Sequence, residues 1–382
     1  MKKRYNILDA LRGFALVGVT LVNAGTINSP FWMDTSDFAF KSTPIDFFLT
    51  EFIFMVFIQK SYPIFAFLFG LSAALMLERI PYNPNKTFLK RLFFLAIFGL
   101  LQVTFFYWGD ILFVYALLGF ALVALLKLGR KGIFFSACIL LVTTFILRAI
   151  IYALGLPEYE YSDLLITPYA TGSFLQILAE RFSNYYDWFY WGFFQTENLA
   201  MWLYYAVYYI ELFLFMNIGA YFIFYKDYFT SIDKYVGLFL KVALFSFIGI
   251  LLFHIANSFS LDWINVLSSI KSILFICLYS SLFCLFYLKM GMVLQKAFSS
   301  FGRMALTWYL GFNALMSFIL YGTGLGLYGS VGPSFVIGIG FVFLLFAFFV
   351  SPLWLNKFQQ GPLEKFWRTL YSSSKKNQTV SS

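Results

Sequence analysis

Apolar residues form long runs along this chain, separated by short polar segments. About ten runs are long enough to cross roughly 30 Å of hydrocarbon as α-helices. A helix satisfies its backbone polar groups internally, so the pattern predicts an all-α transmembrane helix bundle that forms one domain over residues 1–371. The predicted spans are residues 7–23, 61–77, 89–107, 110–126, 132–154, 199–225, 236–256, 270–288, 304–321 and 331–353.

Four further segments are not predicted to cross the membrane. Residues 45–58 are apolar but short and contain Glu51, which favours a re-entrant or interfacial helix. Residues 155–198 combine acidic and aromatic side chains and are predicted to lie on the outer surface. Residues 361–371 form an amphipathic helix on the inner leaflet, in which Glu364 and Arg368 are spaced as an i, i+4 pair. The polar tail 372–382 is predicted to be disordered.

Composition excludes an ordinary water-soluble protein. The 382 residues are 61% hydrophobic and only 12% charged, whereas about 25% of a soluble domain is charged. The three cysteines all lie in apolar runs without metal-ligand spacing, so neither a disulfide nor a metal site is expected. Membrane lipid is the expected surrounding partner.

The basic residues orient the predicted spans. Most of the 27 lysines and arginines fall in alternate loops, which the positive-inside rule assigns to the cytoplasm together with both termini. The net charge of +9 therefore reflects membrane orientation, and no nucleic-acid partner is expected. The basic residues outside these loops are Arg12, Lys41, Lys60, Arg148, Arg181 and Lys271.

Asp9 and Arg12 share one helical face near the cytoplasmic end of the first span, because they are three residues apart. They form either a structural ion pair or a site where Arg12 meets an anionic group from the cytoplasm. At the outer side, Asp110 either caps the fourth span or supplies a carboxylate to an outward-facing site.

Glu211 and His254 lie near the middle of two later spans. An ionisable group at that depth is costly unless it faces a cavity or a partner. The two side chains are candidates for a proton relay or a substrate contact, and His254 is also a candidate catalytic base. The alternative for His254 is a hydrogen bond to a neighbouring helix.

Three separated segments resemble one family of bacterial proteins. They read ILDALRGFALVGVTLVN at 7–23, LLQVTFFYWGDILFVYALLG at 100–119, and FGRMALTWYL at 301–310 followed by GPLEKFWR at 361–368. Together they resemble the YeiB-like membrane proteins, domain of unknown function 418. This resemblance implies a multi-pass protein of the bacterial plasma membrane.

The YeiB-like family is distantly similar to transmembrane acyltransferases, including acyltransferase type 3 and the heparan glucosaminide N-acetyltransferases. The resemblance implies that Arg12, oriented by Asp9, helps to hold a cytoplasmic acyl-CoA, which is a donor substrate and not a resident cofactor. Arg303, in the third motif, is a further candidate for this contact. The acyl group would pass to an outer acceptor in contact with Asp110, which would be an envelope glycan, a lipid or a small molecule.

Two positions depart from these relatives. Asn23 stands where acyltransferase type 3 proteins have a histidine, and Gln102 where YeiB-like proteins often have one. An amide cannot act as a general base near neutral pH, so both are expected to bind substrate or donor, and the base must be Asp110 or His254. Two other hypotheses stay open: a transporter or export component for a small or amphiphilic solute, coupled through Glu211 and His254, and a partner subunit without turnover.

Overall fold

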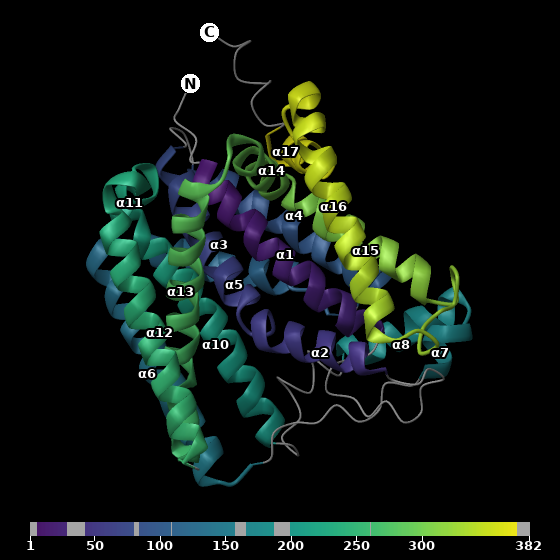
Figure 1. Cartoon of the computed structure of the whole chain (residues 1–382), viewed down its shortest axis with the longest axis horizontal. Helices are drawn as coiled ribbons and strands as arrows, with labels where there is room; N and C mark the ends of the chain where they lie inside the picture. Colours follow the sequence, from purple (N-terminus) through teal and green to yellow (C-terminus); the bar gives the residue numbers. More distant parts are fainter. Residues whose placement is uncertain are drawn as a thin grey trace.

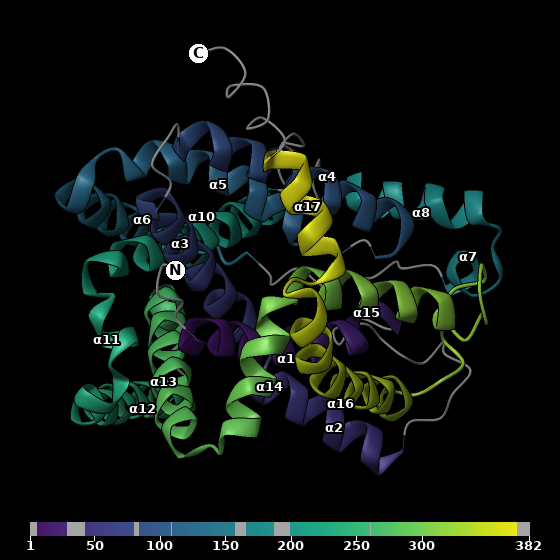
Figure 2. The ribbon, with the colours of Figure 1, turned by 90° about the horizontal axis from the view of Figure 1, so that it is seen from above.

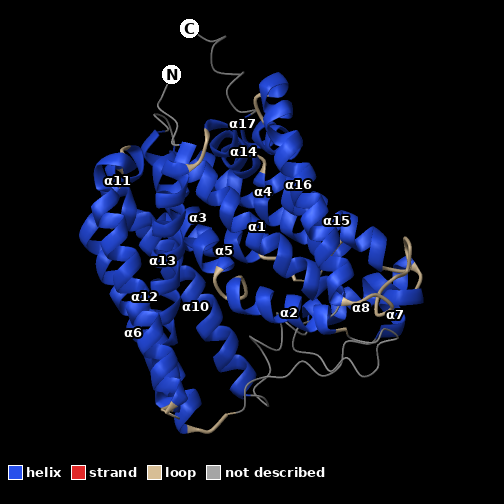
Figure 3. Cartoon of the chain, viewed as in Figure 1, coloured by secondary structure: helices blue, strands red, loops and turns tan. Residues whose placement is uncertain are grey.

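The computed structural model describes residues 6–28, 43–79, 84–107, 109–156, 166–186, 199–259 and 261–372. Within these ranges every regular element is a helix, and Figure 3 shows no strand. The predicted all-α bundle is confirmed. The helices are α1 (Asn6–Asn28), α2 (Pro44–Val56), α3 (Ser61–Arg79), α4 (Pro84–Phe105), α5 (Leu112–Leu126), α6 (Gly129–Ala153), α7 (Ile166–Thr171), α8 (Phe174–Tyr186), α10 (Leu199–Tyr221), η2 (Phe222–Tyr225), α11 (Asp227–Thr230), η3 (Ile232–Tyr235), α12 (Val236–Ser258), η4 (Asp262–Leu267), α13 (Ser268–Lys289), α14 (Met292–Arg303), α15 (Ala305–Leu320), α16 (Pro333–Phe358) and α17 (Pro362–Ser372).

The helices reproduce the predicted crossings. In the described ranges, 8 helical segments are long and apolar enough to span a membrane, and α5 and α15 are shorter apolar helices. Together they correspond to the expected runs. At a rise of about 1.5 Å per residue, α5 is only ~22 Å long, so it does not cross the full hydrocarbon layer on its own. The start of α1 and helix α17 lie at the same end of the bundle (Figure 1).

Helix α1 is the central helix of the bundle. Its most apolar stretch is 83% buried, the largest share among the candidate spans of the described ranges. Figures 1 and 2 show it crossing the middle of the molecule between α3, α14, α15 and α16. Gly13 faces the carbonyl of Phe298, and Gly302 faces the carbonyl of Asp9, so any side chain at either glycine would overlap backbone atoms. Close backbone contact with α14 thus fixes the position of the polar start of α1.

A second glycine pair joins α3 to α10. Gly70 faces the carbonyl of Met216, and Gly219 faces the carbonyl of Phe67, again with no room for a side chain. This contact attaches the group formed by α6, α10, α12 and α13, seen at the left of Figure 1, to the central helices. Small residues at a helix contact allow the close packing that drives helix association in lipid.

Helix α2 lies across the end of the bundle opposite α17 (Figure 1). It has 13 residues and is separated from α3 by a turn in which Gln59 adopts a φ of 58°. Thr43 and Asp46 form a capping box at its start, and Asp46 also accepts a hydrogen bond of 2.7 Å from the backbone N–H of Ser334 in α16. Phe47 is 69% exposed and Met55 is 72% exposed. The helix expected within residues 45–58 is therefore short, anchored at its start and apolar on its exposed face, and its place at the membrane interface stays a prediction.

Part of the expected outer segment 155–198 is described, as α7 and α8. The remainder, residues 157–165 and 187–198, lies outside the described residues, as do residues 373–382 of the polar tail. In α8, Arg181 is buried and donates hydrogen bonds to the carbonyl of Thr104 and to Ser317. This arginine holds α8 against the ends of α4 and α15.

Helix α17 is fixed by Glu364. Its carboxylate accepts hydrogen bonds from the backbone N–H groups of Leu306 at 2.8 Å and Thr307 at 3.1 Å, and from the Thr307 hydroxyl at 2.5 Å. Glu364 therefore caps the start of α15, and the expected pairing with Arg368 is not what holds this carboxylate. Burial raises the pKa of Glu364, while these hydrogen bonds act in the opposite direction.

We predict that Glu364→Ala destabilises the protein by about 1 kcal/mol, because the first backbone amides of α15 lose their acceptor. The midpoint of thermal unfolding in detergent, followed by tryptophan fluorescence, should fall. Glu51→Ala is the matched control, because Glu51 is an exposed carboxylate of α2. Equal midpoints for the two variants would contradict the capping role.

Candidate functional site

The polar residues of α1 gather at its two ends. Asp9 and Arg12 lie near its start, and Asn23, Thr26 and Asn28 are buried near its other end. Because lipid offers no hydrogen bonds, each of these groups must find a partner inside the protein. The partners define two sites on opposite sides of the bundle.

The larger site is a buried polar cluster contributed by α1, α3, α4, the connection between α4 and α5, and α15. Asn23 Nδ2 donates to Asn313 Oδ1 at 3.2 Å, and the Tyr62 hydroxyl donates to Asn23 Oδ1 at 3.1 Å. The hydroxyls of Thr26 and Tyr107 lie 2.6 Å apart. The buried polar cluster consists of Asn23, Thr26, Tyr62, Tyr107, Asp110, Tyr309 and Asn313. We include Gln102, because it is fully buried and lies on the face of α4 that meets Asp110 at Gly99.

Asp110 is the carboxylate of this cluster, and none of its surface is exposed. Its Oδ2 accepts a hydrogen bond of 2.8 Å from the backbone N–H of Phe113, which is the expected cap of α5. Its Oδ1 accepts a hydrogen bond of 3.3 Å from the Tyr309 hydroxyl. Among the described ion pairs, none involves Asp110. Asp110 therefore both caps α5 and belongs to the cluster. Its described hydrogen bonds come from neutral donors.

Gly99 lies directly against the carboxylate of Asp110. A side chain at Gly99 would meet the backbone of Phe113 and Oδ2 of Asp110. Gln102 follows three residues later, so it lies on the same face of α4. Tyr309 also interacts electrostatically with Tyr62 and Tyr107. These contacts bring Asp110 into one region with the hydroxyl groups of the cluster.

Two amide side chains of the cluster have unused hydrogen-bonding groups. Neither polar atom of the Gln102 side chain has a hydrogen-bond partner among the described residues, and the same holds for Nδ2 of Asn313. Both side chains are fully buried. Buried polar atoms are normally satisfied, so these amides mark places where a ligand or an ordered water completes the site.

The smaller site lies near the start of α1. Arg12 Nη1 is 2.9 Å from Asp9 Oδ1, and Arg12 Nη2 donates to the Ser72 hydroxyl at 2.8 Å. The Arg12 side chain is 24% exposed, so its guanidinium is accessible. Arg303, at the end of α14, donates to the carbonyl of Gln359 at 2.7 Å. Eleven residues separate Arg12 from Asn23, which places the two sites about 16 Å apart along α1.

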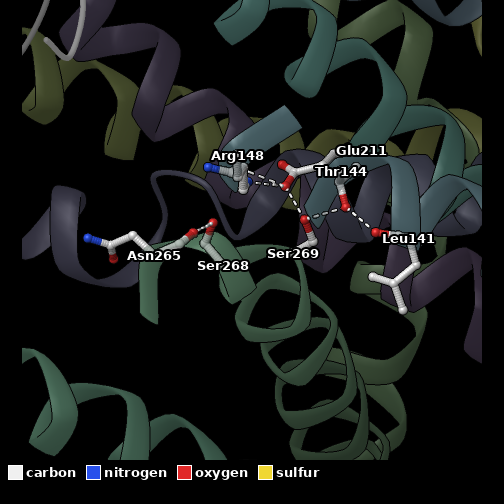
Figure 4. Close-up of polar contacts among 7 residues, drawn as sticks. All are labelled: Leu141, Thr144, Arg148, Glu211, Asn265, Ser268 and Ser269. Atoms are coloured by element: carbon white, nitrogen blue, oxygen red, sulfur yellow. Dashed lines mark hydrogen bonds and ion pairs between the residues drawn. The ribbon is translucent and has the colours of Figure 1, made fainter. Parts of the chain in front are cut away.

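Glu211 is held in a different network (Figure 4). Arg148 donates to Glu211 Oε1 from Nη2 at 2.7 Å and from Nε at 3.2 Å, and the Ser269 hydroxyl donates to the same oxygen at 2.5 Å. Thr144 lies 3.0 Å from Ser269. This network ties α6, α10 and α13 together and satisfies the carboxylate.

His254 does not join either site in the described contacts. It is exposed on α12, and its electrostatic neighbours are Lys60 and Lys271. The structure thus brings Asn23, Gln102 and Asp110 to one cluster and Asp9 and Arg12 to another, while Glu211 and His254 have separate surroundings. Over the ranges that the structure describes, no group of three or more histidine, cysteine or acidic side chains could hold a metal ion.

Sequence reasoning missed five members of the cluster: Thr26, Tyr62, Tyr107, Tyr309 and Asn313. Three of them are tyrosines in a chain with 26 tyrosines, in which a single tyrosine has no distinguishing signal. Asn313 did carry a signal, because it is an amide in the middle of an apolar run.

We predict that Glu211→Gln destabilises the protein by on the order of 2 kcal/mol, because Arg148 then lacks a counter-ion in a poorly hydrated place. The double variant Arg148→Gln with Glu211→Gln should recover part of this loss. Thermal unfolding midpoints of the two single variants and the double variant provide the measurement. If the stability lost in the double variant equals the sum of the losses in the two single variants, Arg148 and Glu211 are not coupled.

Comparison with known proteins agrees with the expected family. Residues 223–374, from η2 to beyond α17, match the family described as "Protein of unknown function (DUF418)". The chain is 28% identical to "Uncharacterized protein YxaH" of Bacillus subtilis (strain 168), over 96% of this chain and 94% of that protein. It is 26% identical to "Uncharacterized 39.9 kDa protein in amylase 3'region" of Bacillus acidopullulyticus, over 97% and 94% of the two chains. No solved structure matches the chain.

These matches and the apolar helices confirm the resemblance inferred from the three motifs. Both relatives align across nearly the whole chain, beyond the region that the family model matches. Residues 223–374 of this membrane protein therefore match the DUF418 family.

Proposed function

We propose that this protein is an acyltransferase of the bacterial plasma membrane. It takes the acyl group of a cytoplasmic acyl-CoA and transfers it to a hydroxyl or amine of an extracytoplasmic glycan, lipid or small molecule. The observation that carries the proposal is the setting of Asp110. This buried carboxylate has hydrogen bonds from neutral donors, no described ion pair, and neighbouring amides with unused polar atoms.

Asp110 acts as the general base in this reaction. The acceptor oxygen or nitrogen attacks the carbonyl carbon of the thioester, and its proton passes to a carboxylate oxygen of Asp110. The new C–O or C–N bond forms, the C–S bond breaks, and the coenzyme A thiolate leaves and takes up a proton. Hydrogen bonds from Phe113 and Tyr309 stabilise the charged form of the carboxylate that accepts the proton.

The amides of the cluster contact the reacting groups. Because the Oδ1 atom of Asn313 is bonded to Asn23, the Nδ2 atom of Asn313 is left to donate to an oxygen that becomes negative in the transition state. Gln102, with an unused donor and an unused acceptor, binds the polar groups of the acceptor. In this assignment Asn23 and Gln102 bind and orient the reacting groups, and no step requires a histidine at either position.

Arg12 holds the donor at the other end of α1. A guanidinium binds phosphate oxygens through paired hydrogen bonds, and Asp9 and Ser72 fix the side chain from one side. Since the two sites are about 16 Å apart along the helix, the thioester arm must extend from Arg12 toward Asp110. The separation of the two sites along α1 supports transfer from one side of the membrane to the other.

No observation favours the transport hypothesis over this one. That hypothesis used Glu211 and His254 as coupling groups, but the hydrogen bonds of Glu211 come from Arg148 and Ser269. His254 has no described contact with Glu211, so a relay between them lacks a connection.

We predict that Asp110→Asn separates binding from transfer. In lipid nanodiscs with radiolabelled acetyl-CoA and an extract of bacterial envelope as acceptor, the variant should bind acetyl-CoA within about twofold of the wild type. Transfer of label should fall by about 10²-fold, the usual effect of losing a general base. Arg12→Ala should lose binding itself, whereas Arg368→Ala, which removes an exposed arginine of α17, should match the wild type.

Two results would contradict the proposal. One is a folded wild-type protein that binds neither acetyl-CoA nor a longer acyl-CoA at millimolar concentration. The other is transfer by Asp110→Asn at the wild-type rate.

A further inference from the structure

A second arginine lies close to Arg12 at the end of the bundle near the start of α1. Arg91 belongs to α4 and is partly exposed. It contacts Met76 in α3, one turn after Ser72, the partner of Arg12, and it interacts electrostatically with Arg12 and with Tyr371 of α17. Figure 2 shows α17 beside α4 at this end of the molecule. Two neighbouring guanidinium groups repel one another, so their proximity needs a compensating interaction.

The described partners of Arg91 do not supply negative charge. Its Nη1 donates to the thioether sulfur of Met76 at 2.9 Å, and sulfur is a weak acceptor. Its guanidinium carbon lies 4.4 Å from the centre of the Trp367 ring. A guanidinium has five N–H donors, so most of the hydrogen-bonding capacity of Arg91 is unused by these contacts.

In the described contacts, no carboxylate is paired with Arg91. Asp9 is bonded to Arg12, Glu78 is paired with Lys226, and Glu364 caps α15. The undescribed segments that precede α1 and α4 and follow α17 in the sequence contain no aspartate or glutamate: they are residues 1–5, 80–83 and 373–382. The electrostatic neighbours given above for Arg91 likewise include no acid. The arrangement therefore fits an external anion.

Trp367 fixes the second arginine in place. Its indole N–H donates to the backbone carbonyl of Arg91 at 3.1 Å while its ring stacks on the guanidinium of the same residue. Glu364, one turn earlier in α17, anchors the helix to α15. Helix α17 thus holds Arg91 through Trp367, and leaves the remaining donors for a ligand.

We propose that Arg12 and Arg91 together form a phosphate-ester site, with α17 as its positioning element. The inference rests on the proposed function and deepens it: the ligand is the phosphate part of the acyl-CoA donor, held by two arginines from different helices. Paired hydrogen bonds to phosphate account for both the unused donors of Arg91 and the closeness of the two positive charges. An anionic phospholipid headgroup carries the same chemical group, so the test must separate these two sources.

The experiment measures binding to the full chain in nanodiscs of phosphatidylcholine, by isothermal titration. The probes are coenzyme A, pantetheine, which has the same arm without phosphates, and phosphatidylglycerol included in the nanodisc as a competitor. The variants are Arg91→Gln, the charge-conserving Arg91→Lys, Trp367→Leu and the control Arg368→Gln. Thermal unfolding midpoints confirm that each variant is folded.

We expect Arg91→Gln to weaken coenzyme A binding at least tenfold and to leave pantetheine binding unchanged, with a smaller loss for Arg91→Lys and for Trp367→Leu. Loss of coenzyme A binding in phosphatidylglycerol nanodiscs, restored by Arg91→Gln, would identify a lipid headgroup as the occupant and overturn the donor assignment. Equal coenzyme A binding by wild type and Arg91→Gln, with loss in Arg12→Ala, would overturn the two-arginine site and leave the proposed function intact. If Arg91→Gln does not fold, coenzyme A binding by Arg91→Lys and Trp367→Leu is compared with binding by Arg368→Gln. Weaker binding by the first two variants supports the two-arginine site, and equal binding by all three overturns it.

Discussion

The structure depends on the need to satisfy the polar groups of α1 inside a lipid-embedded bundle. A buried polar group without a partner costs several kcal/mol in hydrocarbon, so each one selects a neighbour. Arg12 bonds to Ser72 in α3, Asn23 to Asn313 in α15, and Thr26 to Tyr107 in the connection after α4. These bonds, together with the glycine contacts, specify which helices surround α1 and in what register. The same bonds then define the two sites.

Much of the fold followed from hydropathy, because the length of an apolar run is set by the thickness of the bilayer. The runs at 110–126 and 304–321 were recognised although α5 and α15 are short, since their apolar character is continuous. The role of Glu364 could not be predicted in this way. Spacing within α17 suggests a pair with Arg368, whereas its actual partners are backbone amides 57 and 58 positions away, which only the tertiary structure brings near.

The candidate site was predictable only where a residue had a chemical peculiarity. Asp110, Asn23 and Gln102 stood out through the family resemblance, and the structure places them in one cluster. The position of Glu211 deep in an apolar run indicated that this carboxylate needs a partner. Position alone could not identify Arg148 as that partner. The hydroxyls of Tyr62, Tyr107 and Tyr309 had no signal at all, because their function depends on which face of a helix meets α1.

Two carboxylates within the bundle, Glu211 and Asp110, show how surroundings separate a structural role from a chemical one. A carboxylate paired with a guanidinium has a structural role, because removing either partner leaves the other charge without compensation. Glu211 is in that position, bonded to Arg148 and Ser269. Asp110 is bonded only to neutral donors in the described contacts, so protonation costs it no ion pair. This difference, and not depth in the membrane, is why we assign proton transfer to Asp110 and structural support to Glu211.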